Sequence, residues 1–320
     1  MVFKRFLGAL GVGGPSVDTV LDGGAVVPGG VLTGRVLVEG GSMDVEIERI
    51  TLDFIARVER EHEEGESDGT VAFHRAQVGG AFRLAEGERF EVPFSVPVPW
   101  ETPITELYGQ PLGIALGVRT ELAVASAVDK GDLDPLLVRP MPVQEAVLEA
   151  FGQLGFGFRS ADLELGRISG TGQTLPFYQE IELIPPPQYG HVMNEVEVSL
   201  IASPSGLEVV LEADKRGGIF SSGHDVVHRH TVAHGDVGRA DFTGLVDSWV
   251  AQLTGSRRGD HGAAYGHGGH HHGHGDHDDH HGHGGIGAGA VVAGVAAGVV
   301  GGFVAAEIID EIGDAFEGDD

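Results

Sequence analysis

Residues 31–40 alternate between two kinds of position, and this pattern constrains the fold more than any other feature of the chain. The even positions carry Leu, Gly, Val, Val and Gly, while the odd positions include Thr, Arg and Glu. Successive side chains of a β-strand point to opposite faces, so a period of two is expected where one face of a sheet is buried. Residues 47–58 show a similar alternation, and strand-like segments follow at 70–78, 82–98 and 120–128. Short strands joined by glycine and proline turns predict an antiparallel β-sandwich.

The period then changes to that of a helix. Residues 143–154 place apolar side chains at helical spacing, Pro142 suits a first turn, and Gly155 suits a helix end. We expect this helix to lie between two domains. A second amphipathic helix is predicted with Asp241 as its N-cap and Gly255 as its C-cap. Between the two helices, strands are expected at residues 160–168, 173–183, 194–201 and 207–213.

These segments predict an all-β protein with two tandem antiparallel β-sandwich domains and a tail. The first domain is expected over residues 1–130 and the second over 131–255, with the two helices included in the second. Residues 256–285 are almost entirely His, Gly and Asp, and without apolar periodicity they are expected to be a disordered linker. Residues 286–320 predict a helix of Gly, Ala and Val followed by an acidic end.

Four segments of the chain resemble a known family. The segment VDTVLDGGAVVPGGVLTGRVLVEGG (residues 17–41) resembles the opening strands of arrestin-like domains. Three later segments narrow the resemblance to the bacterial sporulation-control family SpoOM, namely TELAVASAVDKGDLDPLLVRP (120–140), FGFRSADLELGRISG (156–170) and TLPFYQEIELIPPP (174–187). This resemblance implies a pair of arrestin-like β-sandwiches, no catalysis, and a regulatory role in sporulation or development through contacts with protein partners. It does not extend to the histidine tract.

Composition excludes several classes of function. The formal net charge is −28, with 48 acidic and 20 basic residues, and a field of that sign repels nucleic acid. The absence of cysteine excludes disulfides and thiol chemistry and fits a reducing compartment. The apolar residues near the N-terminus are interrupted by glycines and predict a short helix over residues 3–10 instead of a secretory signal. We therefore expect a cytoplasmic protein.

Catalytic motifs are missing from the sequence. There is no glycine-rich phosphate loop ending in Lys and a hydroxyl residue, and no G-x-S-x-G elbow. The acidic runs at residues 59–66 and 129–134 are expected to lie in turns, where their charges are simply solvated. The sequence thus predicts a non-enzyme that needs no cofactor.

Histidines form a spaced cluster before the second helix: His224, His228, His230 and His234. On a strand, His228 and His230 would share one face, where two imidazoles can ligate a metal ion. A third ligand would have to come from one of the other two through loop geometry. The alternative interpretation is that these are ordinary surface histidines.

The tail holds a denser set of imidazoles. Neutral imidazole is a good ligand for zinc, nickel and copper, and a glycine-rich chain can wrap several of them around one ion. The tract can equally serve as a spacer whose positive charge rises as the pH falls. Besides His261, the candidate metal ligands are His267, His270, His271, His272, His274, His277, His280, His281 and His283.

Residues 286–306 carry small residues at a four-residue period, which is typical of closely packed helices. These residues are Ala290, Gly294, Gly298, Gly302 and Ala306. A helix so rich in glycine needs a partner, because each glycine costs about 1 kcal/mol relative to alanine. The candidates are a second copy, another protein, a groove on its own sandwich, or a membrane, since twenty-one residues can span a bilayer. Against the membrane, the segment lacks flanking Lys, Arg, Trp and Tyr.

Overall fold

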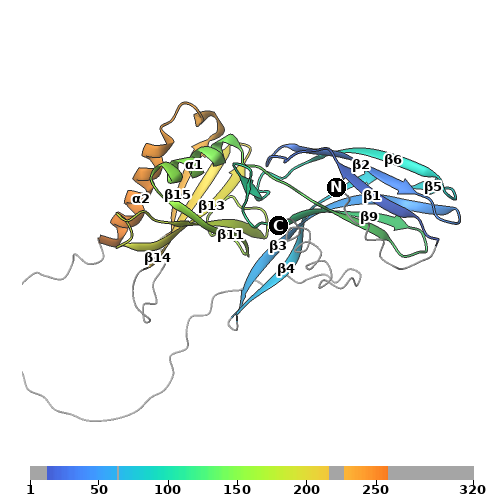
Figure 1. Ribbon diagram of the computed structural model, residues 1–320, viewed down its shortest axis with the longest axis horizontal. Coiled ribbons are helices and arrows are strands. Elements are labelled where there is room, and N and C mark those ends of the chain that lie inside the picture. The colour runs from blue at the N-terminus through green and yellow to red at the C-terminus, as the bar shows by residue number, and fades with distance from the viewer. Residues whose placement is uncertain (1–12, 63–64, 216–226, 259–320) are drawn as a thin grey trace, which may run out of the picture.

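The structure is a computed structural model that describes residues 13–62, 65–215 and 227–258 (Figure 1). Predictions for residues 1–12 and for the tail (residues 259–320) lie outside the described residues. The first half of the chain is built of strands: β1 (Ser16–Leu21), β2 (Val31–Glu39), β3 (Val45–His62), β4 (Gly65–Gly79), β5 (Phe82–Leu84), β6 (Arg89–Pro97), β7 (Glu106–Leu107), β8 (Gln110–Pro111), β9 (Leu116–Val124) and β10 (Lys130–Pro135).

Two sheets face each other in this half (Figure 1). One has the order β1-β2-β6, and the other contains β10-β9-β3, with β4 and β5 also paired to β3. The alternation predicted for residues 31–40 is confirmed, because Leu32, Val36 and Val38 are buried while their neighbours are more exposed. They pack against side chains of the opposite sheet such as Ile50 and Leu52.

The second half begins with a helix and ends with one. Its elements are α1 (Pro142–Gln153), β11 (Gly157–Leu165), β12 (Phe177–Ile184), β13 (Met193–Ser203), β14 (Gly206–Lys215), β15 (His228–Ala233), a 3-10 turn η1 (His234–Asp236) and α2 (Phe242–Arg258). Strands β11 to β15 pair in chain order as an antiparallel meander. A single parallel bridge between Glu164 and Glu59 joins β11 to β3, so the two halves share one continuous sheet.

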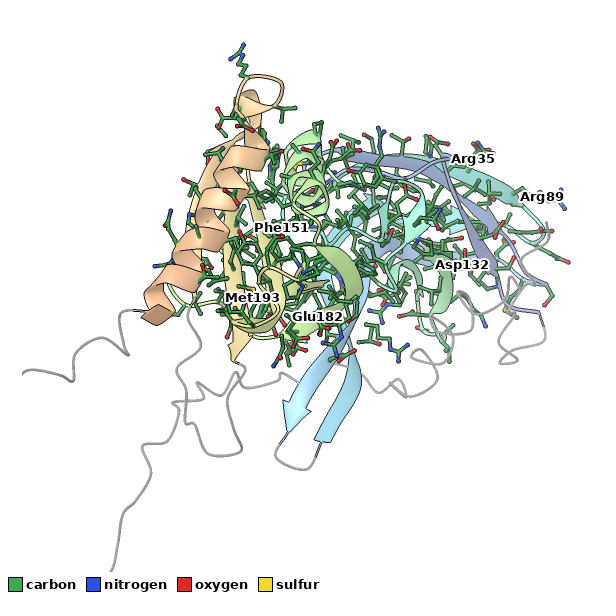
Figure 2. All side chains as sticks on the ribbon, turned by 60° about the vertical axis from the view of Figure 1, so that its left-hand side comes forward. Arg35, Arg89, Asp132, Phe151, Glu182 and Met193 are labelled. Atoms are coloured by element: carbon green, nitrogen blue, oxygen red, sulfur yellow. The ribbon has the colours of Figure 1, made fainter. Side chains whose placement is uncertain are left out.

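Both helices cover the same face of this meander (Figure 1). Phe151 of α1 and Met193 of β13 are fully buried between the layers (Figure 2), and Val246, Val250 and Leu253 of α2 join them. Helix α1 thus packs on α2 and the sheet, whereas the sequence placed it between two domains. The layer opposite this sheet is helical, and buried residues of both halves belong to one contiguous core.

Three of the four residues predicted to mark helix ends do so in the structure. Pro142 occupies the first turn of α1, and Gly155 follows its end with a φ of +89°, which glycine adopts without strain. The Oδ1 atom of Asp241 accepts a hydrogen bond from the backbone N–H of Gly244 at 3.0 Å, so the predicted N-cap of α2 is confirmed. The C-cap prediction at Gly255 is wrong, because α2 continues through it to Arg258.

Both acidic turns predicted from the sequence are strands instead. β3 runs to His62 and β4 begins at Gly65, with Glu59 opposite Asp68, so the expected turn is the end of a long hairpin. Residues 130–135 form β10, which pairs with β9. In both places, backbone pairing with a neighbouring strand outweighs the tendency of acidic residues to sit in turns.

Candidate partner-binding surface

The face of the meander opposite the helices carries a concentration of acidic side chains. Alternate residues of β14, such as Val209 and Leu211, are buried beneath the helices, so the residues between them point to the other side. The same alternation holds in the neighbouring strands. We call the resulting group the acidic sheet face: Asp162 and Glu164 of β11, Glu180 of β12, Glu197 of β13 and Glu212 of β14.

Strand register brings these carboxylates side by side. Asp162 lies directly opposite Glu180, and Glu197 lies directly opposite Glu212. Directly opposed residues of antiparallel strands approach to about 5 Å, and like charges at that spacing repel. At one end of the row, the Arg159 guanidinium contacts Glu195 and lies 3.4 Å from Glu182. Figure 2 labels Glu182 on this sheet.

The crowding perturbs the protonation of the central glutamate. Burial and the nearby charges of Glu197 and Asp162 raise the pKa of Glu180 to about 8, so that it is largely protonated at neutral pH. Burial and the charge of Glu180 likewise raise the pKa of Tyr178. An opposing cation would reverse both shifts, since opposite charge favours the ionised carboxylate.

A shallow hollow of about 200 Å³ opens at this part of the sheet. Its walls include Tyr178, Glu180, Glu197, Ser199 and Glu212. The hollow therefore combines carboxyl, hydroxyl and phenol groups on one surface, a composition suited to accepting hydrogen bonds from a basic partner.

Three of these acids also approach one another closely enough to share an ion. Asp162, Glu164 and Glu180 each offer an oxygen, and these oxygens lie within 4.8 Å of one another. Carboxylate oxygens suit hard cations such as Ca²⁺ and Mg²⁺. The zinc, nickel or copper ligands predicted from the sequence, His267 to His283, lie outside the described residues.

Of the histidine cluster predicted before α2, His224 lies outside the described residues and the other three are described. His228 and His230 do share a face, with ring centroids 6.3 Å apart. His230, however, stacks on Trp249, while the Nε2 atom of His234 lies 2.9 Å from the carbonyl oxygen of Ser203. Among the described residues no histidine trio converges on a common point.

The acidic sheet face was missed in the sequence although a signal was present. Four segments carry acids whose positions differ by two or four, as in the run Glu180-Ile181-Glu182. Period two places such acids on one face of a strand. What the sequence alone does not give is the register that sets the four strands' acids beside one another.

These features define an all-β protein of arrestin-like fold whose second half exposes an acidic sheet face. No helix within the described residues has the length and apolar character needed to cross a bilayer. The chain belongs to the SpoOM protein family, whose model matches residues 3–217.

Similarity to individual proteins agrees with this assignment. The chain is 34% identical over 217 residues to the sporulation-control protein spo0M of Bacillus subtilis (strain 168), which covers 67% of this chain and 81% of that protein. It also matches the crystal structure of Spo0M from Bacillus subtilis with a TM-score of 0.66 and 28% identity, over 76% of this chain and 100% of that one. The predicted family and the all-β, arrestin-like fold are thereby confirmed.

Proposed function

We propose that this sporulation-related protein is a non-catalytic regulator that acts by binding other proteins in the cytoplasm, and that the acidic sheet face is its binding surface for a basic partner. The observation that carries the proposal is the strand register that gathers five carboxylates on one face, with Asp162 opposite Glu180 and Glu197 opposite Glu212, and this crowding helps to raise the pKa of Glu180. Groups held in an unfavourable protonation state are concentrated at functional sites. A basic partner would relieve the repulsion that the isolated face maintains.

The free energy of contacts between opposite charges favours recognition of the partner by its charge. Each close opposite-charge contact at a partly buried site contributes on the order of 1 kcal/mol or more, and such contacts mainly set specificity and association rate. A chain with a net charge of −28 also attracts basic partners from a distance, within the screening length of about 8 Å at physiological salt.

A charge-neutralised variant tests the proposal. We would compare the full chain with the triple variant Glu180→Gln, Glu197→Gln, Glu212→Gln in pull-downs from the native cells, and then measure the captured partner's affinity at increasing salt. A matched control removes three exposed acids elsewhere: Asp22→Asn, Glu86→Gln and Glu149→Gln. We expect the partner to be lost, or its affinity to fall at least tenfold, only in the acidic-face variant. Equal binding by both variants would refute this assignment.

The other functions that the sequence predicts concern the tail. Metal binding by His267 to His283, and membrane association or self-assembly through residues 286–306, remain predictions because these residues lie outside the described part of the chain.

A further inference from the structure

A second surface feature lies at the free edge of the meander, next to the acidic sheet face. It is a groove of about 500 Å³ that follows β15 and includes residues from both sides of that strand. Its walls are formed by Gly170, Glu208, Arg229, His230, Thr231, Leu245 and Trp249. Because β15 is the last strand in the sheet order, one of its backbone edges is paired with β14 and no described strand pairs with the other.

The wall on the helix side is neutral and largely apolar. The His230 ring stacks on Trp249 with centroids 4.6 Å apart, and Leu245 lines the same wall. Burial lowers the pKa of His230, so its imidazole is uncharged at neutral pH. Its buried Nε2 atom has no hydrogen-bond partner among the described residues, which leaves one unsatisfied polar atom in an otherwise apolar wall.

The wall on the opposite side carries one charge of each sign. A guanidinium nitrogen of Arg229 donates to the carbonyl oxygen of Ser169 at 3.1 Å, and Glu208 accepts the backbone N–H of Gly172 at 3.2 Å. These two charges balance, so the groove does not select a charged ligand. Gly170 has a φ of +77°, and a side chain there would collide with Arg229. The absence of a side chain at Gly170 therefore lets this wall lie close to the strand.

An unpaired strand edge attracts another strand, and proteins usually protect such edges. In the first sandwich, the edge strand β6 carries Pro93 and Pro97, which cannot donate to a further strand. β15 (HRHTVA) has no proline and no lysine. The combination of an unprotected edge with a groove on both sides of it is the geometry of strand addition, in which backbone bonds give affinity and alternate side chains enter pockets.

We propose that a stretch of about six residues within residues 286–306 of the same chain, the Gly/Ala/Val segment, occupies this groove as an added strand beside β15, which is itself six residues long. The segment is uncharged, as the balanced groove requires, whereas the acidic residues 307–320 would meet Glu208 and the molecule's net negative field. Its Val and Ala side chains are small enough for a groove of this size. Its six glycines weaken an isolated helix by about 1 kcal/mol each and also weaken an isolated strand, so the segment needs a partner in either form.

The tether is long enough for this docking. Trp249 lies nine residues before Arg258 on α2, or about 14 Å along the helix axis. The 27 residues of 259–285 can span at most roughly 90 Å, so they can return the segment to the groove with length to spare. Because the two partners are joined covalently, binding needs no high concentration of protein. The docked segment then covers the edge that would otherwise pair with another chain.

Cysteine crosslinking tests the proposal, since the chain contains no cysteine of its own. Thr231→Cys, at an exposed position on β15, would be combined with one cysteine at a time at Val291, Val292, Ala293 or Gly294. Adjacent strands place Cα atoms about 4.5–5.5 Å apart, within disulfide range, but only alternate residues share a face. We expect intramolecular disulfides with a two-residue period, with yields at least about fivefold higher at the favoured positions. A matched control carries Ser205→Cys, exposed in the β13–β14 turn, in place of Thr231→Cys.

Hydrogen exchange supplies an independent readout that needs no substitution. Amides of β15 should exchange at least about tenfold more slowly in the full chain than in a chain lacking residues 286–306, at every protein concentration. Uniform or absent crosslinking together with unchanged exchange would overturn the proposal. Protection that rises with concentration, accompanied by intermolecular disulfides, would overturn it in favour of a second copy at the edge.

Discussion

The Glu101 carboxylate accepts hydrogen bonds from both the backbone N–H and the hydroxyl of Thr174, at 2.8 Å and 2.6 Å. A third bond comes from the backbone N–H of Leu175 at 3.1 Å. Close by, the Gln179 side-chain amide exchanges two 2.9 Å hydrogen bonds with the backbone of Ile104. Glu101 and Ile104 follow β6, whereas the other three residues surround the start of β12, so this polar clamp joins the two halves of the protein.

Replacing Glu101 by alanine should loosen the clamp. Three donors lose a charged acceptor, and because the site is partly exposed we expect the free energy of unfolding to fall by about 1–2 kcal/mol. Urea denaturation measures this change, and the Thr174 amide should exchange faster with solvent in the variant. Glu86→Ala, an exposed acid in the same half, is the control and should change neither quantity. Equal effects of the two substitutions would show that the clamp contributes nothing.

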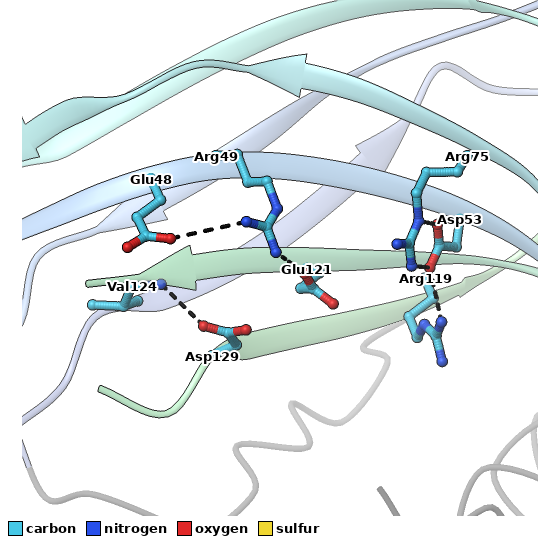
Figure 3. A network of polar contacts seen from close by, with 8 residues as sticks. All are labelled: Glu48, Arg49, Asp53, Arg75, Arg119, Glu121, Val124 and Asp129. Atoms are coloured by element: carbon cyan, nitrogen blue, oxygen red, sulfur yellow. Dashed lines mark hydrogen bonds and ion pairs between the residues drawn. The ribbon is translucent and has the colours of Figure 1, made fainter. Parts of the chain in front are cut away.

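A buried acid ties together three strands of the first sandwich (Figure 3). The Asp53 side chain on β3 is 1% exposed, and its two oxygens accept bonds from Arg75 of β4 at 2.5 and 2.6 Å. Arg119 of β9 donates to the same carboxylate at 2.8 Å. Burial alone would raise the pKa of Asp53, but the hydrogen bonds from the two arginines outweigh it and hold the pKa below its ordinary value.

Asp53→Asn should therefore destabilise the protein strongly. Removing one partner of a buried charge group typically costs about 3 kcal/mol or more. Arg75→Gln should cost less than Asp53→Asn, because the Arg75 side chain is 61% exposed and Arg119 still contacts the acid. Since the folded-state pKa is lowered, the stabilisation by Asp53 is present above its ordinary pKa and is lost as the pH falls below it. Denaturation at pH 7 and pH 3 should show the difference between wild type and Asp53→Asn shrinking at the lower pH.

Local signals predicted much of the fold. The alternation around Val36 identified β2, and Pro142 with Gly155 bracketed α1 because both residues act through their own backbone geometry. The N-cap prediction at Asp241 is also correct, because its side chain bonds a backbone N–H only three residues along the chain. The predicted helix end at Gly255 is wrong, since burial of Leu253 within α2 outweighs the small cost of one helical glycine.

The functional surfaces depend on relationships that no local pattern contains. Glu180 alone resembles any solvated glutamate, and its raised pKa arises from burial in the sheet and from the charges of Glu197 and Asp162, which β13 and β11 place near it. β15 is short and polar, so its sequence carried no strand signal, and pairing with β14 decides its conformation. The Glu101–Thr174 contact spans 73 residues, which is beyond any period or motif.

The coupling within the acidic sheet face can be measured directly. Glu197→Gln removes a neighbouring negative charge and should lower the pKa of Glu180 from about 8 toward its ordinary value. Carbon-detected NMR titration of the glutamate carboxyl groups reads this midpoint. Glu39→Gln, in the first sandwich, serves as the control and should leave it unchanged. An unaltered Glu180 midpoint in Glu197→Gln would mean that the charge of Glu197 does not contribute to this pKa.

Two sheet edges in the first sandwich meet through acidic side chains. The Asp132 Oδ2 atom on β10 accepts the backbone N–H of Thr19 on β1 at 2.6 Å, and the hydroxyls of Thr19 and Thr120 lie 2.6 Å apart. Asp134 lies two residues further along β10, on the same face. Burial, followed by the charges of Asp132 and Asp18, raises the pKa of Asp134 to about 7.

This shift gives stability a defined dependence on pH. The folded state binds a proton at Asp134 more tightly than the unfolded chain does, so ionisation of Asp134 lowers stability as the pH rises from about 4 to about 7. Asp134→Asn removes that ionisation. After allowance for solvent screening of this partly exposed group, we expect the variant to be about 1–2 kcal/mol more stable than wild type at pH 8 and equally stable at pH 4. Urea unfolding at the two pH values tests this, with Asp22→Asn as the exposed control. A stability difference that stays constant across this range would show that Asp134 is already ionised throughout it.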